Sequence, residues 1–224
     1  NHKEALLNYI DLIGWNSKTT KEIFSLPELI EAFSLDGLQI ANGIFDPEKL
    51  KWMNSKYIAA TPADELVKIL SDYLKQYNSE FYENTFITHD EAFNRAVITE
   101  VQKRCETLAD FPALSECFYQ EPEVDTALLL SEKMGITDLA QAKEALQFGV
   151  GIIKTFTSTP SRDALKDAMI PKIAEAGKKN GQILWPLRVA LTGKEFSPGA
   201  FEMTEILGLE KAVARIEKAV ARLS

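Results

Sequence analysis

Cysteine and histidine are scarce in this chain of 224 residues, which holds two of each. The two cysteines, Cys105 and Cys117, are too few for a disulfide-dense secreted scaffold or for a zinc site with four cysteine ligands. No apolar run reaches the roughly 18 residues that a membrane span needs, and the first residues start an amphipathic helix pattern instead of a secretory signal. We therefore expect a cytoplasmic protein without a membrane partner.

Motifs of catalytic and metal-binding chemistry are also missing. Gly149-Val150-Gly151 lies in a helix-like stretch with no strand before it, so it does not have the context of a phosphate loop. Neither an H-E-x-x-H motif nor paired cysteines at metal-ligand spacing occur. Both cysteines stand among apolar residues, as buried core thiols do, and His89 beside Asp90 is typical of a helix start. These absences favour a binding module over a catalyst and predict no metal site.

Apolar side chains recur every three or four residues along almost the whole chain, as on one face of an α-helix. Ser25-Leu26-Pro27-Glu28 has the pattern of a capping box, and Thr61-Pro62 marks a second helix start. No sustained two-residue alternation indicates a strand, so the sequence predicts an all-α fold. The expected helices cover 4–13, 25–33, 47–57, 61–74, 88–108 with Thr88 as its cap, 125–133, 138–154, 161–177, 181–192 and 209–223, and a further one begins near Ala200.

The charge is acidic overall but unevenly spread. Acidic residues exceed basic ones by 33 to 25, which gives a net charge of −8 and argues against nucleic-acid binding through bulk charge. Residues 162–194 nevertheless carry seven basic side chains against three acidic ones. This segregation leaves room for a local basic face.

Three segments carry the strongest signals: 1–15 (NHKEALLNYIDLIGW), 45–58 (FDPEKLKWMNSKYI) and 183–202 (ILWPLRVALTGKEFSPGAFE). In the third, Arg188 stands among apolar residues, either as an ion-paired structural group or as a guanidinium that reaches a cleft to meet a base edge or a phosphate. Ser197-Pro198-Gly199 is either a helix cap and turn or a helix start whose free N–H groups bind phosphate or an unstacked base. The residues alone leave both alternatives open.

Taken in order, these segments resemble the C-terminal region of bacterial glutamyl-tRNA synthetases. The shared motifs are ALLNY followed by GW, FD-x-x-KL-x-W-M-N, and PLR-x-ALTG followed by PG-x-F-E, with a closing Lys/Arg-rich helix such as 209–223. The resemblance implies a curved stack of helices that grips the anticodon as part of a glutamate–tRNA ligase. The H-I-G-H and K-M-S-K-S signatures of the catalytic core are absent. ATP, magnesium and aminoacylation are therefore expected in a catalytic N-terminal half of the same polypeptide, with tRNA as the partner of this chain and no cofactor in it.

The resemblance also implies a division of the chain. Residues 1–60 would end the stem-contact region, and 61–126 and 127–224 would form the two helical anticodon-binding subdomains.

Individual contacts follow from the matched motifs. Arg104, in VQKRCETLADF, matches the arginine associated with the third anticodon base, although a surface pairing with Glu100 is the alternative. Arg188 matches a second anticodon-reading arginine. Ser197, Pro198 and Ala200 match contacts further on; Ser197 keeps the hydroxyl of the family's usual threonine, whereas Ala200 offers less surface than the larger apolar residue found there. Candidate phosphate contacts are Lys172, Lys178, Lys179 and Lys194.

The sequence leaves other functions open. A related ligase that charges both glutamate and glutamine tRNAs would carry the same motifs. A stand-alone helical protein-interaction scaffold is the alternative from another class and would have no affinity for tRNA. A self-contained enzyme is disfavoured because the catalytic motifs are missing.

Overall fold

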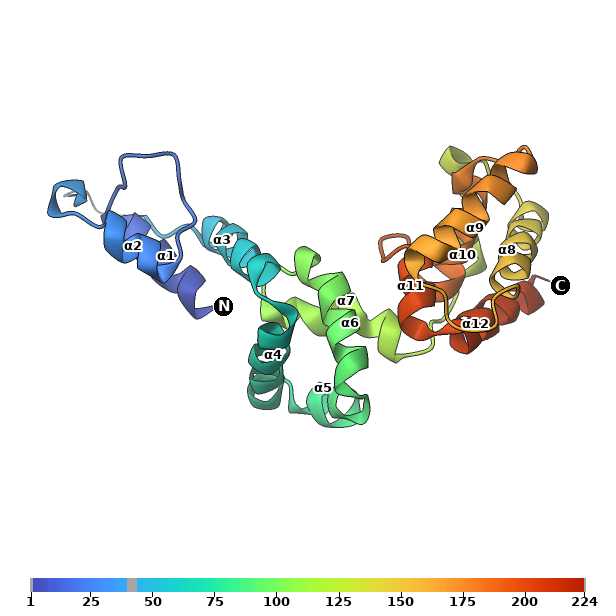
Figure 1. Cartoon of the computed structure of the whole chain (residues 1–224), viewed down its shortest axis with the longest axis horizontal. Helices are drawn as coiled ribbons and strands as arrows, with labels where there is room; N and C mark the ends of the chain where they lie inside the picture. The colour runs from blue at the N-terminus through green and yellow to red at the C-terminus, as the bar shows by residue number, and fades with distance from the viewer. Residues whose placement is uncertain (1, 40–43, 224) are drawn as a thin grey trace. The chain divides into compact units, whose positions relative to one another are not determined.

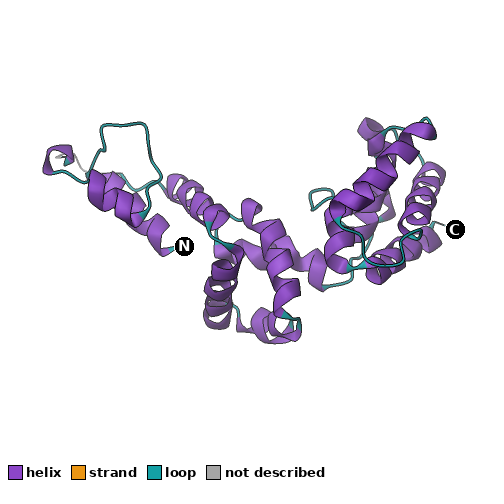
Figure 2. Cartoon of the chain, in the orientation of Figure 1, coloured by secondary structure: helices purple, strands orange, loops and turns teal. Residues whose placement is uncertain are grey.

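The computed structural model describes residues 2–39 and 44–223. Asn1, the first residue of the segment 1–15 discussed above, lies outside the described residues. Within these ranges the chain is helical and contains no strand, only isolated bridges between Trp15 and Leu38 and between Ser131 and Ile136 (Figure 2). The all-α prediction is confirmed. Across the same described ranges, no helix combines the length and the apolar character needed to cross a membrane.

Contacts between backbone positions divide the chain into two compact units, 1–114 and 115–224. In the first unit, Tyr9, Leu50 and Met53 form one small core and Trp15, Phe24 and Leu29 form another. Its elements (Figure 1) are α1 (Lys3–Gly14), α2 (Leu26–Ala32), η1 (Leu35–Gly37), α3 (Pro47–Ala60), α4 (Ala63–Tyr77), α5 (Ser79–Asn84), η2 (Phe86–Thr88), α6 (Glu91–Val101), η3 (Gln102–Arg104) and η4 (Leu108–Asp110), and α7 (Phe111–Tyr119) follows.

The second unit is built around one central helix. Helix α10 (Asn180–Thr192) contacts α8 (Leu139–Ile153), α9 (Arg162–Glu175), α11 (Ala200–Leu207) and α12 (Leu209–Arg222). A Cβ atom at Gly149 would lie 2.5 Å from Leu187 Cδ1, so glycine at this position lets α8 approach α10 closely. The Gly149-Val150-Gly151 run therefore serves helix packing.

The predicted helix over 88–108 is wrong at both ends. Helix α6 begins at Glu91, because the Asp90 carboxylate rather than Thr88 accepts the backbone N–H of Phe93 at 2.7 Å. It ends at Val101, after which the 3₁₀ turn η3 holds Arg104. The carboxylate of Asp110 accepts the backbone N–H groups of both Glu106 (3.0 Å) and Thr107 (2.7 Å), and these bonds compete with continuation of the helix.

The predicted helix over 125–133 is also wrong. Two 3₁₀ turns stand there instead, η5 (Thr126–Leu129) and η6 (Glu132–Met134). Ser131 and Ile136 exchange backbone hydrogen bonds at 2.8 and 3.0 Å, and the turn between them passes through Gly135 at a φ of 78°. That left-handed conformation favours glycine, and the closed turn replaces the helical pattern.

Candidate functional site

Helix α10 presents an aromatic ring and a guanidinium on the same face. Trp185 and Arg188 are three residues apart, and Arg188 Cζ lies 4.6 Å from the centre of the Trp185 ring. The indole Nε1 of Trp185 donates to the Leu128 carbonyl at 3.0 Å, which ties the ring to η5. Arg188 is half-buried on this ring. The Arg188 cation therefore lies over the π face of a ring whose indole N–H is fixed by a hydrogen bond.

This pair borders a cavity of about 240 Å³. Residues of η6, α10 and the start of α11 line it, and Arg188 and Glu202 are its only charged lining residues: Met134, Gly181, Leu184, Trp185, Arg188, Gly199, Ala200, Phe201 and Glu202. A Cβ atom at Gly181 would lie 2.7 Å from Met134 Sδ, so glycine leaves room for the Met134 thioether at one side of the cavity. We call this cavity the Arg188 pocket.

The Arg188 pocket has the character of a site for a flat, polar-edged ring. Its walls are mainly apolar and aromatic. The planar guanidinium carries N–H groups in a fixed geometry that can donate hydrogen bonds to the edge of a ring. Proteins read unstacked nucleic-acid bases with this combination of aromatic or arginine planes and polar groups at the base edge. No titration or nucleophilic chemistry is needed for such a site.

Of the three contacts predicted after α10, at Ser197, Pro198 and Ala200, only one lines the pocket. Helix α11 begins at Ala200 as predicted, but its N-cap is Gly199, so Ser197 is not the cap. The Ser197 hydroxyl is hydrogen-bonded to Thr192 Oγ1 at 3.0 Å, and Pro198 is buried. Ala200 lines the Arg188 pocket, whereas Ser197 and Pro198 belong to the adjoining loop.

The sequence pattern does not single out two aromatic residues of this pocket. Trp185 and Phe201 occupy apolar positions of helical segments, where an aromatic side chain is usually a core residue. The signal that could have found them is spacing: Trp185 stands one helical turn before Arg188, and Phe201 directly follows Ala200.

Arg104 lies in the other unit, on η3. Its Nη2 atom is 3.5 Å from Glu100 Oε1, so the surface pairing considered from the sequence is present, and 41% of the Arg104 side chain is exposed. Its assignment to the third anticodon base stays a prediction.

The four candidate phosphate-binding lysines divide into two pairs. Lys178 forms an ion pair with Glu144 at 2.9 Å, and Lys194 forms one with Glu116 at 2.7 Å. Lys172 on α9 and Lys179 before α10 are exposed. The second pair is therefore better placed to meet a phosphate.

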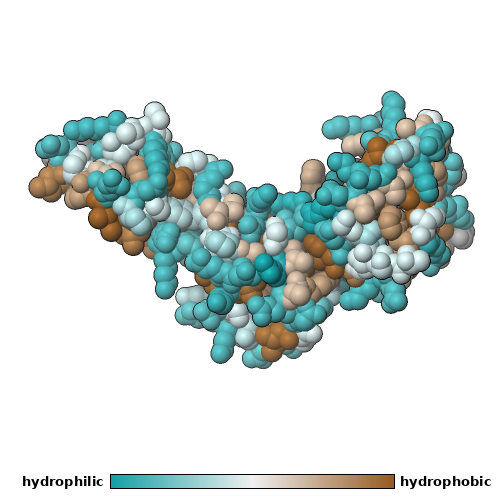
Figure 3. All heavy atoms as spheres, viewed as in Figure 1, coloured by the Kyte–Doolittle hydropathy of each residue, from teal (hydrophilic) through white to brown (hydrophobic). Residues whose placement is uncertain are grey.

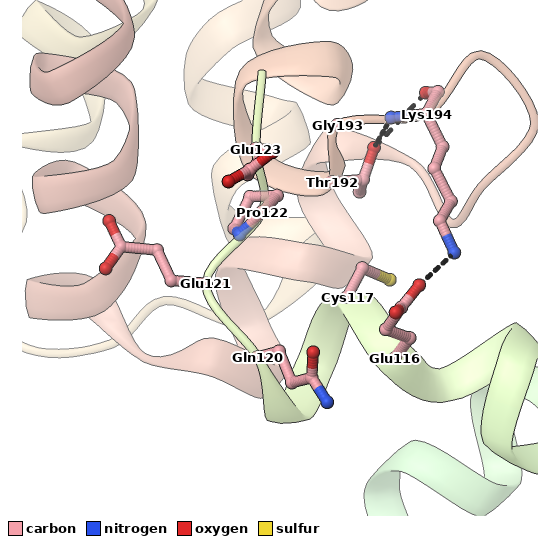
Figure 4. Close-up of a pocket in the computed structure, with 9 residues that line it drawn as sticks. All are labelled: Glu116, Cys117, Gln120, Glu121, Pro122, Glu123, Thr192, Gly193 and Lys194. Carbon is pink, nitrogen blue, oxygen red and sulfur yellow. Dashed lines mark hydrogen bonds and ion pairs between the residues drawn. The ribbon is translucent and has the colours of Figure 1, made fainter. Parts of the chain in front are cut away.

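A second cavity, of about 350 Å³, lies beside residues 116–123 and 192–194 (Figure 4). Lys194 spans its edge to reach Glu116, and Cys117 also lines the cavity. Among the residues that the structure describes, no group of three His, Cys, Asp or Glu side chains converges to hold a metal ion.

Comparison with known proteins finds similarity to one family of domains and to longer proteins that contain it. A family model described as an anticodon binding domain matches residues 65–220. Glutamate–tRNA ligases of Clostridium tetani and of Clostridium botulinum (strain Eklund 17B) are each 36% identical to the chain over 223 residues, which are 99% of this chain and 43% and 44% of the relatives. The chain thus spans less than half the length of these curated relatives.

Solved structures show the same fold. A glutamate tRNA ligase from Elizabethkingia meningosepticum superposes with a TM-score of 0.76 at 23% identity, over 99% of this chain and 41% of that one. A glutamate-tRNA synthetase from Elizabethkingia anophelis superposes with a TM-score of 0.75 at 25% identity, over 97% and 40%.

Proposed function

Because the chain belongs to the family of anticodon-binding domains, we propose that it binds the anticodon of glutamate-accepting tRNA as the C-terminal part of a glutamate–tRNA ligase. The resemblance read from the three sequence segments agrees with the family match. The observation that carries the proposal is the Arg188 pocket, where a guanidinium over the face of an indole lines a mainly apolar cavity.

In this proposal one anticodon base leaves the loop and enters the Arg188 pocket. Its ring face contacts apolar and aromatic side chains, and the Arg188 guanidinium donates to its edge. Ala200 adds a small contact at the start of α11. Arg104 would read a second base from the first unit, and Lys172 and Lys179 would contact phosphates without reading sequence.

The chain would contribute binding and positioning to the parent reaction. Anticodon contacts far from the reacting groups supply binding energy that orients the tRNA, so that its acceptor end reaches the activated glutamate. ATP and magnesium would act in the catalytic part of the longer protein, outside this chain. In the same proposal, residues 1–60, which precede the matched range of 65–220, end a stem-contact region, and 61–126 and 127–224 are the two anticodon-binding subdomains. A cytoplasmic location would follow from this role in translation.

The test is a titration of the chain with labelled glutamate tRNA, glutamine tRNA and an unrelated tRNA at two salt concentrations. We expect salt-sensitive binding that prefers the glutamate tRNA. Arg188→Ala should weaken it by about 1–3 kcal/mol, the usual worth of one base contact. Arg95→Ala, which also removes one arginine but from the surface of α6, is the matched control. A thermal unfolding curve of each variant verifies that it is folded.

Two outcomes would change the proposal. Equal binding of glutamate and glutamine tRNAs, with the unrelated tRNA rejected, would assign the chain to a ligase that does not discriminate between them. Equal weak binding of all three tRNAs, unaffected by Arg188→Ala, would contradict the anticodon site and favour a helical interaction scaffold.

A further inference from the structure

The loop between α10 and α11, residues 193–199, holds a side chain that the Arg188 pocket does not use. Phe196 is 93% exposed, the largest value among the large apolar side chains of the described residues. The surface seen in Figure 3 is mostly hydrophilic, with apolar residues in scattered patches. Because single exposed apolar residues are common, exposure alone does not indicate a function. The structure of the loop around Phe196 gives the further evidence.

The first half of this loop is held in place. Gly193 ends α10 at a φ of 69°, and a Cβ atom there would lie 2.8 Å from the Glu123 carbonyl, so the backbone presses against the 122–123 segment. Lys194 Nζ then reaches Glu116 at 2.7 Å, as Figure 4 shows. The chain leaves α10 with little freedom.

The second half is held as well. The Ser197 hydroxyl is hydrogen-bonded at 3.0 Å to Thr192 Oγ1, which itself donates to the Arg188 carbonyl at 2.7 Å. Pro198 is buried, and Gly199 already lines the Arg188 pocket. Only Glu195 and Phe196 are exposed in this loop. A ligand that meets the Phe196 ring therefore does not have to order the loop, which removes one of the entropic costs of binding.

Phe196 is also close to the pocket. Two residues, Ser197 and Pro198, separate it from Gly199 at the pocket rim, so the two Cα atoms are within about 11 Å of each other. The neighbouring Glu195 carboxylate repels a phosphate but not the neutral face of a base. The surroundings of the ring therefore favour stacking on a base over contact with the RNA backbone.

We propose that Phe196 is a stacking platform for an unpaired nucleotide of the anticodon loop beside the one held in the Arg188 pocket. This inference rests on the proposed function and extends it by one nucleotide. Every base has a π face, so the platform adds affinity with little sequence preference, while Arg188 supplies the discrimination.

The test measures the Kd of an anticodon stem-loop RNA for the wild-type chain and three variants. Phe196→Ala should raise the Kd roughly 5- to 150-fold, the range that loss of one base–aromatic stack produces. Phe196→Trp, which keeps a π face, should bind at least as tightly as the wild type. Phe196→Leu keeps apolar surface without a ring and should lose most of the affinity. Because the side chain is exposed, all three should unfold at the wild-type temperature.

The salt dependence separates this contact from a charge contact. Phe196→Ala should leave the slope of log Kd against log salt concentration unchanged, whereas loss of a phosphate-binding lysine lowers that slope by about one. A fluorescent base analogue beside the anticodon should be quenched on binding to the wild type and to Phe196→Trp, and not on binding to Phe196→Ala.

Failure of the inference can be told apart from failure of the proposed function. If Arg188→Ala weakens binding and Phe196→Ala binds within twofold of the wild type, the platform is wrong and the pocket stands. Full affinity of Phe196→Leu would also overturn the platform, because a stack requires a ring. If the wild-type chain binds neither stem-loop nor tRNA, both proposals fail.

Discussion

At the residue scale, three basic side chains of α12 form hydrogen bonds or ion pairs with other parts of the chain: Arg215, Lys218 and Arg222. The buried guanidinium of Arg215 donates through Nη1 to the carbonyls of Cys117 (2.6 Å) and Leu191 (2.7 Å) and through Nη2 to that of Gln120 (2.7 Å). Burial lowers the pKa of Arg215, yet the side chain stays charged. These bonds hold the end of α7 and Gln120 against α10 and α12.

Removal of Arg215 should therefore destabilise the fold. Arg215→Met keeps the apolar stem but leaves three carbonyls without their donor, and we expect a loss of about 2–4 kcal/mol in the free energy of unfolding. Lys218→Ala on the same helix breaks an exposed ion pair with Glu121 and should cost less than about 1 kcal/mol. Urea unfolding of both variants gives the comparison. Equal losses would mean that the bonds of Arg215 add little.

Cysteine chemistry follows from burial at the same scale. Burial raises the pKa of the Cys105 thiol to about 12, so the reactive thiolate is absent at neutral pH. We expect a thiol reagent to modify Cys105 at least a hundredfold more slowly in the folded chain than in the denatured chain. Peptide mapping after timed labelling checks this. Fast labelling of folded protein would show that the site opens readily. The sequence already indicates this outcome, because both cysteines stand among apolar residues.

Residue patterns could find Arg188 but not its surroundings. A lone arginine in an apolar run is visible in any sequence, whereas Trp185 and Phe201 look like ordinary core positions. A helix face that packs against a neighbour and one that lines a cavity have the same apolar pattern. The Arg188 pocket also needs Met134 of η6 beside α10 and the start of α11, and η6 ends in a left-handed turn at Gly135 that helical periodicity does not reveal.

At the element scale, short polar motifs decide where helices begin and end. The Ser25 capping box is present as the sequence predicts, with the Glu28 carboxylate accepting the Ser25 N–H at 2.8 Å. The same chemistry explains why the predicted 88–108 helix is wrong at both ends. The Asp90 carboxylate caps the helix at its start, and the Asp110 carboxylate accepts backbone N–H groups beyond its end. The spacing of apolar residues continues past the end of α6. Periodicity alone therefore predicts one long helix where the carboxylates end it.

The capping box of α2 should make the stability of the first unit depend on pH. The hydrogen bond from Lys21 and those from the backbone and hydroxyl of Ser25 lower the pKa of Glu28 to about 2 in the folded chain. In the unfolded chain its pKa is near 4.5. A lowered pKa in the folded state means that the stabilisation is complete above pH 4.5 and is lost as the pH falls towards 2.

Glu28→Gln isolates this effect. The difference in unfolding free energy between wild type and Glu28→Gln should be constant above pH 5 and shrink between pH 4.5 and 2. Lys21→Met is the companion variant and should move the pKa of Glu28, followed by NMR, back towards 4.5. A Glu28 that titrates near 4.5 in the wild type would show that the box does not persist in solution.

At the scale of the whole molecule, charge that is segregated along the sequence is not segregated in the same way in space. Three of the basic residues in 162–194 are ion-paired with acids that lie outside that stretch: Arg162 with Glu205, Lys178 with Glu144, and Lys194 with Glu116. The positive excess of the segment is thus partly neutralised by tertiary contacts, which no count along the chain can foresee. Lys172 and Lys179 stay exposed.

This distribution predicts which lysines carry the electrostatic part of tRNA binding. The double variant Lys172→Ala/Lys179→Ala should weaken binding of every tRNA alike and lower the slope of log Kd against log salt concentration by up to about two, since each phosphate contact releases counterions. Lys178→Ala/Lys194→Ala removes the same charge but also frees Glu144 and Glu116. It should weaken binding at low salt by general repulsion, because the acids add two uncompensated negative charges, and change the slope less. Filter binding at four salt concentrations measures both slopes. A larger slope change in the second double variant would place the phosphates at the ion-paired lysines, with tRNA displacing their acidic partners.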